Sequence, residues 1–397
     1  MAKNKTEEYK NKPVDFILCI TVLLLLALGI VMVLSASSPS SFSETGNSYT
    51  FVKQQAFSAG IGLVAMFIIS KIDYRVYKPL YKLAYVGSIG LLALVPLIGV
   101  EAGGAKRWID LGFMSFQPSE LAKIGLIVFF AAFLSERKDK LKHIWHGFGM
   151  PFALVAPAAI ILLFFQEHFS ATLIIVAVMS IMMIVAGSKI SHFLTVGLAG
   201  GTALVAYIFT KGAGFRMDRI NAWLDPWADP TGDAWQAIQS LYAIGSGGLF
   251  GAGLGQSKQK YLYIPEPHND FIFSILAEEL GFIGCVIVIL LFAVFIWRGV
   301  IISMKAPDIF GSLLAVGITA LIGLQAIINI AVVTASIPVT GMPLPFFSYG
   351  GTALIILLCG VRSVTEYIKT KHENLGTKDS FWQCMGEHCS PVFETNE

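Results

Sequence analysis

An acidic residue, Asp270, stands where a polar, glycine-rich stretch of the chain gives way to a long apolar run. Pro265 and Pro267 restrict the backbone before it, and Asn269 is a residue type that caps helices. The pattern predicts a helix with Asn269 as its N-cap and Asp270 in its first turn. There the helix dipole stabilises an acid, whereas a general base works best with a pKa near the working pH. Two roles for Asp270 therefore remain open: an acid that stabilises the end of the helix, or a general base at the boundary between water and lipid.

Basic residues accompany this acid on the same polar stretch and on one other loop. They suit an anionic group such as a diphosphate, although basic residues on a solvated loop need no ligand. Glycines in the same stretch permit close approach to the backbone, but they also permit tight helix packing in membranes. The candidates for an anion site are Lys106, Arg107, Arg216, Arg219, Lys258 and Lys260.

Glu120 and Lys123 lie three positions apart at the start of an apolar run. On a helix they share one face, and ionisable groups in membrane helices face the bundle interior or a wet cavity. They are therefore either a structural ion pair or part of a cavity lining. His168, at a polar break between two apolar runs, is likewise either structural or part of a site.

The composition is that of a membrane protein. Of 397 residues, 55% are hydrophobic and 14% are charged, against roughly 25% charged in ordinary domains. The mean hydropathy is +0.70. A net charge of +2 without a basic cluster argues against a nucleic-acid partner.

Apolar runs predict ten transmembrane helices, because about 20 apolar residues cross the hydrocarbon layer. They are expected at 14–36, 55–71, 80–100, 120–135, 150–166, 170–187, 191–209, 270–297, 309–333 and 351–369. The predicted fold is an all-α polytopic membrane domain over 14–369, with a large extracellular loop, 210–269, between the seventh and eighth helices. Residues 1–13 are expected to form a cytoplasmic segment, and residues 370–397 a disordered cytoplasmic tail.

The positive-inside rule sets the expected orientation. Lys and Arg recur at the helix ends that share a side with the amino terminus, which places both termini in the cytoplasm of a cytoplasmic-membrane protein. Asp270 then lies at the outer face. The segment 336–351 has three prolines and a glycine pair, which predict a broken segment that is buried or lines a cavity. Gln325 and Asn329 put a polar stripe on the helix before it.

Three long stretches carry specific motifs: AKRWIDLGFMSFQPSELAKI, DPTGDAWQAIQSLYAIGSGGLFGAGLGQSKQKYLYIPEPHNDFIFSILAEELGFIG and NIAVVTASIPVTGMPLPFFSYGGTAL. Together they resemble the SEDS family (shape, elongation, division and sporulation), which includes FtsW, RodA and SpoVE. The second stretch is most similar to the division and sporulation branch. The resemblance implies ten helices and a peptidoglycan glycosyltransferase. Such an enzyme polymerises lipid II at the outer membrane face during division or sporulation, with inversion and release of undecaprenyl diphosphate.

The family's catalytic acid maps onto Asp270, with Asn269 in place of the usual Thr. The implied substrate or diphosphate site comprises Lys106, Arg107, Glu120, Lys123, Arg216, Gln239, Lys258, His268 and Ser348. A divalent cation, Mg²⁺ or Mn²⁺, is a candidate cofactor with Asp270 as a candidate ligand, and no organic cofactor is expected. The implied partners are a class B penicillin-binding protein, lipid II and other divisome or sporulation membrane proteins.

The chain departs from the family at Glu167-His168-Phe169-Ser170, where many relatives carry Pro-Asp-x-Gly. Two other functions remain open. Polar groups within the bundle would also suit a flippase for a lipid-linked precursor. A non-enzymatic scaffold for the penicillin-binding protein would not need Asp270.

Overall fold

The computed structural model describes residues 15–102, 105–110, 112, 115–193, 221–228, 230–232, 234–261 and 263–365. Several predictions lie outside these residues. They are most of the seventh predicted helix, Arg216, Arg219, the segment 1–13 and the tail 370–397.

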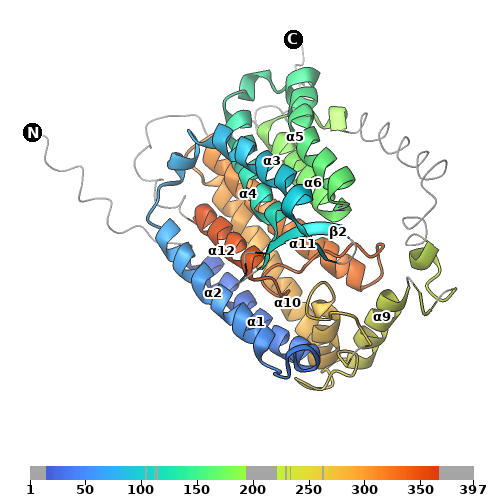
Figure 1. The fold of residues 1–397 in the computed structure, drawn as a ribbon. Helices are drawn as coiled ribbons and strands as arrows, with labels where there is room; N and C mark the ends of the chain where they lie inside the picture. The colour runs from blue at the N-terminus through green and yellow to red at the C-terminus, as the bar shows by residue number, and fades with distance from the viewer. Residues whose placement is uncertain are drawn as a thin grey trace, which may run out of the picture.

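Long apolar helices build the molecule (Figure 1). Among the described residues, eight helical runs are long and apolar enough to cross a membrane. They are α1 (Phe16–Thr45), α2 (Thr50–Ile69), α3 (Tyr81–Ile98), α4 (Pro118–Ser135), Trp145–Phe165, α6 (Phe169–Ala186), α10 (Ile272–Met304) and α11 (Ile309–Val333). The run Trp145–Phe165 joins η4 (Trp145–Gly149), α5 (Met150–Ile160) and η5 (Ile161–Phe165). These runs and the shorter α12 (Gly351–Thr365) confirm the polytopic helical fold, while the count of ten stays a prediction.

Polar contacts between α1 and α10 show the relative direction of these two helices. Asp15 caps α1 and pairs with Arg298 near the end of α10, whereas Ser35 further along α1 contacts Glu279 near the start of α10. The two helices are therefore antiparallel. The end of the bundle where α4, α6, α10 and α12 begin is called the loop-rich end below.

A small antiparallel sheet, absent from the all-α prediction, connects α3 to α4. Its strands are β1 (Val100–Ala102), β2 (Ala105–Asp110) and β3 (Ser115–Phe116), in the order β1-β2-β3. Val100 pairs with Trp108, and Ile109 pairs with Phe116. Strand β2 lies beside α3 and α4 (Figure 1). Apolar periodicity over so few residues is too weak a signal to predict such strands.

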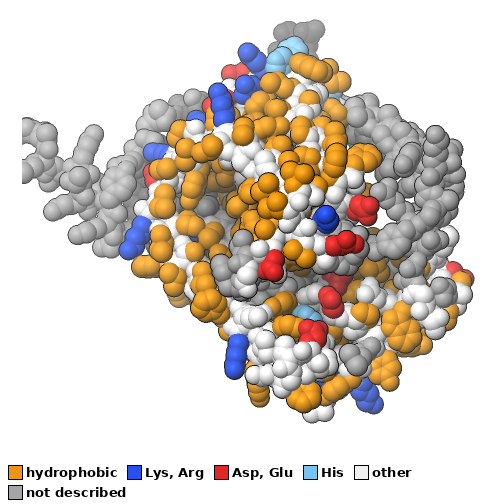
Figure 2. Space-filling model, in the orientation of Figure 1, with side chains coloured by type: hydrophobic (Ala, Val, Ile, Leu, Met, Phe, Trp, Pro, Cys, Tyr) orange, Lys and Arg blue, Asp and Glu red, His pale blue; other side chains and the backbone are white. Residues whose placement is uncertain are grey.

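Large apolar side chains cover the outside of the helices. Examples with more than half of their surface exposed are Phe57, Val64, Phe67, Leu83 and Leu97. Figure 2 shows hydrophobic side chains over α3 and α6, with acidic side chains gathered in the band around β2 and below it. This surface is suited to lipid, since an aqueous face would rarely carry so wide an apolar patch.

Helix α10 is broken at Gly281, whose backbone (φ 67°, ψ −167°) is not helical. The loop that follows α9, residues 248–260, inserts its backbone at the break and is called the glycine-rich loop below. Ala252 N donates to Glu278 O at 2.9 Å, Gly253 N donates to Glu279 O at 3.1 Å, and Phe282 N donates to Gly248 O at 2.9 Å. The loop thus supplies partners for backbone groups that the break leaves unpaired. Such pairing is required for irregular backbone at membrane depth.

Helix α9 (Trp235–Gly247) lies inside the stretch predicted as a loop and packs against the first part of α10. A Cβ on Gly247 would come within 2.0 Å of Ala277 O. At Gly251, a Cβ would meet Glu279 O at 2.1 Å. The close-packing interpretation is therefore confirmed for these two glycines.

We expect Gly281→Ala to destabilise the protein, because Ala pays about 1–3 kcal/mol for this backbone conformation and its Cβ would lie 2.3 Å from Gly251 N. The measurement is thermal unfolding of the detergent-purified protein. The control is Gly60→Ala in α2, where a Cβ would meet nothing within 4 Å. Equal melting temperatures for the two variants would contradict the interlock between the loop and α10.

Candidate functional site

Asp270 lies at the loop-rich end, just outside α10. The predicted cap is wrong: α10 begins at Ile272 with Phe271 at the N-cap position, and Asn269 instead donates from Nδ2 to Glu266 Oε2 at 2.6 Å. Asp270 is half-buried. Its carboxylate faces Gly341, where a Cβ would lie 3.7 Å from Asp270 Oδ2. The acid is therefore further from the helix dipole than the sequence predicted.

Asn329 of α11 ties together the two chain segments that frame this acid. Its Nδ2 donates to Asp270 O and to Met342 O, each at 2.7 Å. The side chain is fully buried. One amide thus fixes both the segment that carries Asp270 and the segment that carries Gly341. The polar stripe on α11 predicted this position, though not its partners.

His268 and Ser348 form a packed layer beside Asp270. The His268 ring stacks on Phe51 of α2, with centroids 4.9 Å apart, and His268 O accepts from Tyr349 N at 2.9 Å. Burial lowers the pKa of His268 to about 4, so the ring is neutral at pH 7. Ser348 Oγ accepts from Leu344 N at 2.7 Å. Both side chains support the fold of the site, and their roles in binding substrate stay predictions.

The ion pair of Glu120 and Lys123 is buried inside the bundle on the first turns of α4. Lys123 Nζ lies 2.8 Å from Glu120 Oε1, and the two side chains are 3% and 7% exposed. The attraction within a buried ion pair seldom exceeds the cost of removing both charges from water, so apolar residues in its place are often equally stabilising. The pair is therefore a candidate for a functional role as well as a structural contact.

His168 is the N-cap of α6 and packs beside this pair. Its Nδ1 accepts from Ala171 N at 3.3 Å, and its Nε2 lies 3.1 Å from the Gln117 amide nitrogen. Since Nδ1 accepts, the ring proton is on Nε2, and the Gln117 amide must turn its oxygen toward it. Burial, together with the charges of Arg107 and Lys123, lowers the pKa of His168 to about 3. In this chain a neutral histidine thus caps α6.

Arg107 is placed by the loop before α6. Its Nη2 donates to Glu167 O at 2.8 Å and its Nε to Gln166 O at 3.2 Å. Gln166 in turn donates to Leu92 O at 2.8 Å. The guanidinium is therefore anchored through backbone carbonyls, beside the capping His168.

A hydrogen bond connects the segment around Asp270 with the group formed by Glu120, Lys123, Arg107 and His168. Ser170 Oγ of α6 donates to Thr340 O, and Thr340 precedes Gly341, where a Cβ would lie 3.7 Å from Asp270 Oδ2. The structure thus links Asp270 and His268 to Glu120, Lys123 and Arg107 at the loop-rich end. Arg216 lies outside the described residues.

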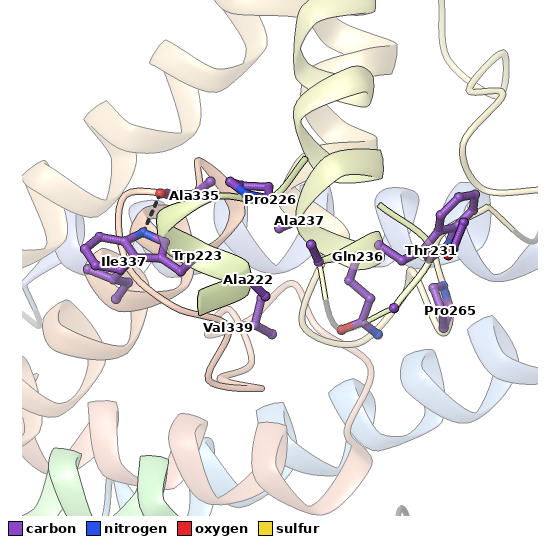
Figure 3. A pocket seen from close by; sticks show the side chains of 13 residues that line it. Ala222, Trp223, Pro226, Thr231, Gln236, Ala237, Pro265, Ala335, Ile337 and Val339 are labelled. Atoms are coloured by element: carbon purple, nitrogen blue, oxygen red, sulfur yellow. Dashed lines mark hydrogen bonds between the residues drawn. The ribbon is translucent and has the colours of Figure 1, made fainter. Parts of the chain in front are cut away.

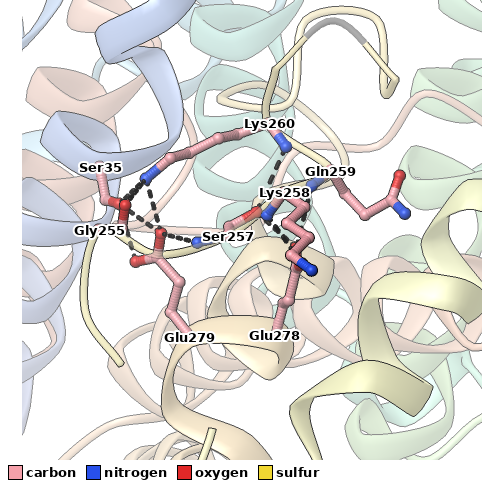
Figure 4. A network of polar contacts seen from close by, with 8 residues as sticks. All are labelled: Ser35, Gly255, Ser257, Lys258, Gln259, Lys260, Glu278 and Glu279. Atoms are coloured by element: carbon pink, nitrogen blue, oxygen red, sulfur yellow. Dashed lines mark hydrogen bonds and ion pairs between the residues drawn. The ribbon is translucent and has the colours of Figure 1, made fainter. Parts of the chain in front are cut away.

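Lys258 and Lys260 were both predicted as part of an anion site, but the structure places the two side chains in different surroundings. Lys260 is buried, and its Nζ donates to Glu279 Oε1 at 2.9 Å and to Gly255 O at 2.7 Å (Figure 4). Its charge is used to hold the loop, so the prediction of a ligand site is wrong for Lys260. The Lys258 side chain is exposed, while its backbone N donates to Glu278 Oε1 at 2.8 Å.

The remaining predicted site residues, Gln239 and Lys106, lie on two other elements, α9 and β2. Gln239 is buried on α9, next to Ser240, whose Oγ donates to Val333 O at 2.6 Å. Lys106 is exposed on β2 and pairs in the sheet with Glu101. Both stay predictions as substrate contacts.

Some residues that shape the site were not predicted. Gln55 of α2 donates from Nε2 to Ser348 O at 3.1 Å and accepts from Gly350 N at 3.2 Å. Ser35 of α1 donates to both carboxylate oxygens of Glu279. The sequence signal for such residues is an amide or hydroxyl side chain inside an apolar run. Within a membrane such a group must hydrogen-bond to another part of the protein, because lipid offers no partner.

No group of three or more His, Cys, Asp or Glu side chains suited to a metal ion occurs in the part of the chain that the structure describes. Asp270 supplies one carboxylate. That is compatible with the Mg²⁺ mode in which one or two carboxylates and substrate phosphates share the ion.

Comparisons with known proteins agree with this fold. A family model for FtsW, RodA and SpoVE, described as "Cell cycle protein", matches residues 16–373. Stage V sporulation protein E of Bacillus subtilis (strain 168) is 45% identical over 354 residues, which cover 89% of this chain and 96% of that protein. A probable peptidoglycan glycosyltransferase FtsW of Geobacter sp. (strain M18) is 44% identical over 349 residues, 87% of this chain and 94% of that one.

Solved structures share the fold. A chain of a peptidoglycan synthase complex that coordinates polymerisation and crosslinking superposes with a TM-score of 0.78, at 29% identity, over 91% of this chain and 99% of that one. The rod shape determining protein RodA of Thermus thermophilus superposes with a TM-score of 0.68, at 28% identity, over 91% and 98%. Sequence and structure together thus define a multi-pass helical membrane protein. The chain belongs to the FtsW/RodA/SpoVE family.

We expect Lys123→Met to destabilise the protein by about 3–5 kcal/mol, because it leaves the Glu120 charge buried without its partner. The double variant Glu120→Gln/Lys123→Met should recover most of that loss. Unfolding in detergent measures both. Arg137→Met at the half-exposed pair with Glu136 is the control, with a cost of about 0–1 kcal/mol. A double variant no more stable than the single one would contradict an uncompensated charge as the cause.

We expect His168 to make stability depend on pH. Its pKa is lowered on folding, so in acid the unfolded chain binds a proton that the folded chain does not. Its contribution is complete above the unfolded pKa near 6.5 and is lost as the pH falls toward 3. His168→Asn keeps a capping oxygen but cannot titrate. Between about pH 7 and about pH 5 the wild type should lose more melting temperature than the variant, and parallel curves would contradict this.

Proposed function

We propose that this protein is a peptidoglycan glycosyltransferase that polymerises lipid II into glycan strands. The observation that carries the proposal is the placement of Asp270. Asp270 is half-buried, its Oδ2 would lie 3.7 Å from a Cβ at Gly341, and Asn329 fixes the two segments that frame it. The relatives named as probable peptidoglycan glycosyltransferases, at 44% and 41% identity over 87% of the chain, support it.

In the proposed reaction Asp270 is the general base. It takes the proton of the 4-hydroxyl of the acceptor sugar, and that oxygen forms a bond to the anomeric carbon of the growing glycan. The bond from this carbon to the diphosphate oxygen breaks, and the electron pair leaves with undecaprenyl diphosphate. Attack from the opposite face converts an α-linkage into a β-linkage. A base beside buried apolar residues is well placed for this role, because little water competes for the proton.

Positive side chains offset the charge that develops on the leaving diphosphate. Lys123 and Arg107 are candidates because the structure holds each of them in place at the loop-rich end. Lys106, Lys258 and Arg216 are further candidates. A divalent cation, Mg²⁺ or Mn²⁺, would be held by the Asp270 carboxylate and the diphosphate oxygens, and would supply additional positive charge there.

The proposed site faces the outside of the cytoplasmic membrane, with both chain ends in the cytoplasm. Basic residues between the helices at the end opposite the loop-rich end support this orientation, among them Arg137, Lys138, Lys140, Arg298 and Lys305. The proposed partner is a class B penicillin-binding protein, supported by the likeness to a chain of a peptidoglycan synthase complex. The proposed process is division or sporulation, which the named relatives support.

We expect Asp270→Asn to lower lipid II polymerisation by about 10²–10⁴-fold, the range that a general base contributes. The assay uses the purified protein with its penicillin-binding partner in detergent micelles, where flipping across a bilayer cannot yield polymer. Glu266→Gln is the matched control, since it removes an exposed acid from the same segment.

Wild-type polymerisation by Asp270→Asn would contradict the assignment of this base. If no polymer forms with the wild type either, the scaffold or flippase function is favoured. Thermal unfolding of each variant shows whether a lost activity reflects a lost fold.

A further inference from the structure

A cavity of about 300 Å³ lies beside the segment that carries Asp270 and is separate from the contacts described above. It is lined by part of the 222–237 stretch, by Pro265 and by the 335–339 segment. Figure 3 shows Trp223 and Ile337 at one side of it, Thr231 and Pro265 at the other, and Gln236 between them.

Two indole rings in the cavity wall are held rigidly by their own N–H groups. Trp223 Nε1 donates to Ala335 O at 2.9 Å, and Trp235 Nε1 donates to Tyr263 O at 2.6 Å. With the N–H groups paired, each ring offers a ligand apolar and aromatic surface rather than a hydrogen-bond donor. Rigid aromatic faces bind with little loss of conformational entropy.

The lining is uncharged but not purely apolar. Of the described residues in the wall, none is a Lys, Arg, Asp, Glu or His. Gln236 is half-buried there, and its side-chain amide has no hydrogen bond to a described residue. An amide provides both a donor and an acceptor. The wall therefore fits a neutral ligand with apolar faces and polar edges.

We propose that this cavity binds one N-acetylated sugar ring of the glycan strand, next to the reacting bond. This inference rests on the proposed function. A pyranose ring has C–H groups on its faces, which attract the electron-rich face of an indole, and hydroxyl and acetamido groups at its edges. The Gln236 amide pairs with such an edge group, and the acetamido methyl packs against Ile337 or Val339.

The position of the cavity supports a strand subsite. Val339, in its wall, is two residues before Gly341, which faces the Asp270 carboxylate: a Cβ there would lie 3.7 Å from Asp270 Oδ2. Two residues span at most about 7 Å, so the cavity lies close to the proposed base. Its volume is at the lower end of the range for small-ligand sites, about 300–1,000 Å³. That size fits a sugar ring better than a helix of a partner protein.

The test measures binding of a soluble probe, the β-1,4-linked tetramer of N-acetylglucosamine, to the full chain in nanodiscs. Gln236→Ala and Trp223→Leu should each weaken binding by about tenfold, the equivalent of about 1.4 kcal/mol. Trp227→Leu is the matched control, because Trp227 belongs to the same segment but is exposed and outside the wall. The tetramer of glucose, which lacks acetamido groups, should bind more weakly than the probe.

Equal probe affinity in the wild type, Gln236→Ala and Trp223→Leu would overturn the proposal. So would loss of co-purification with the penicillin-binding partner at unchanged probe affinity, which would make the cavity a protein contact. Since probe binding needs no catalysis, Asp270→Asn should bind as the wild type does. A wild-type protein that binds the probe but forms no polymer would contradict the proposed function alone.

Discussion

The break in α10 is the constraint on which the rest of the loop-rich end depends. A membrane helix interrupted at Gly281 leaves backbone groups that lipid cannot satisfy. The glycine-rich loop supplies their partners, and glycines allow it to approach closely enough to do so. The same loop is then held by two adjacent acids of α10: Glu278 accepts from the backbone of Lys258, and Glu279 pairs with the buried Lys260 (Figure 4). Charge and backbone geometry thus cooperate to hold the segment that leads to Asp270.

The two buried ion pairs, Lys260 with Glu279 and Glu120 with Lys123, have different structural roles. The pair of Lys260 and Glu279 also includes Ser35 of α1, so it connects α1, the loop and α10. The pair of Glu120 and Lys123 lies within one turn of α4 and connects no distant elements through its own contact. Since the second pair contributes little to assembly, its burial at the loop-rich end is better accounted for by the proposed binding of a diphosphate.

The sequence predicted the helices well because the hydrocarbon thickness dictates their length and apolarity. It identified Asn329 by its polarity in an apolar run, and the pairing of Glu120 with Lys123 by their spacing. It could not predict that Asn269 turns back to Glu266, or that Lys260 is buried while Lys258 is exposed. Those outcomes depend on the fold of the glycine-rich loop against α10, a contact between distant backbone atoms that residue types alone do not encode.

The most direct test of the proposed chemistry is a structure of the protein with its partner, bound to an acceptor lipid II and an unreactive donor analogue. If Asp270 is the general base, the acceptor 4-hydroxyl will lie about 2.6–3.2 Å from its carboxylate, or one water away, which is the reach of a general base. A well-ordered acceptor whose 4-hydroxyl instead contacts another side chain, with Asp270 turned away from it, would show that Asp270 is not the base.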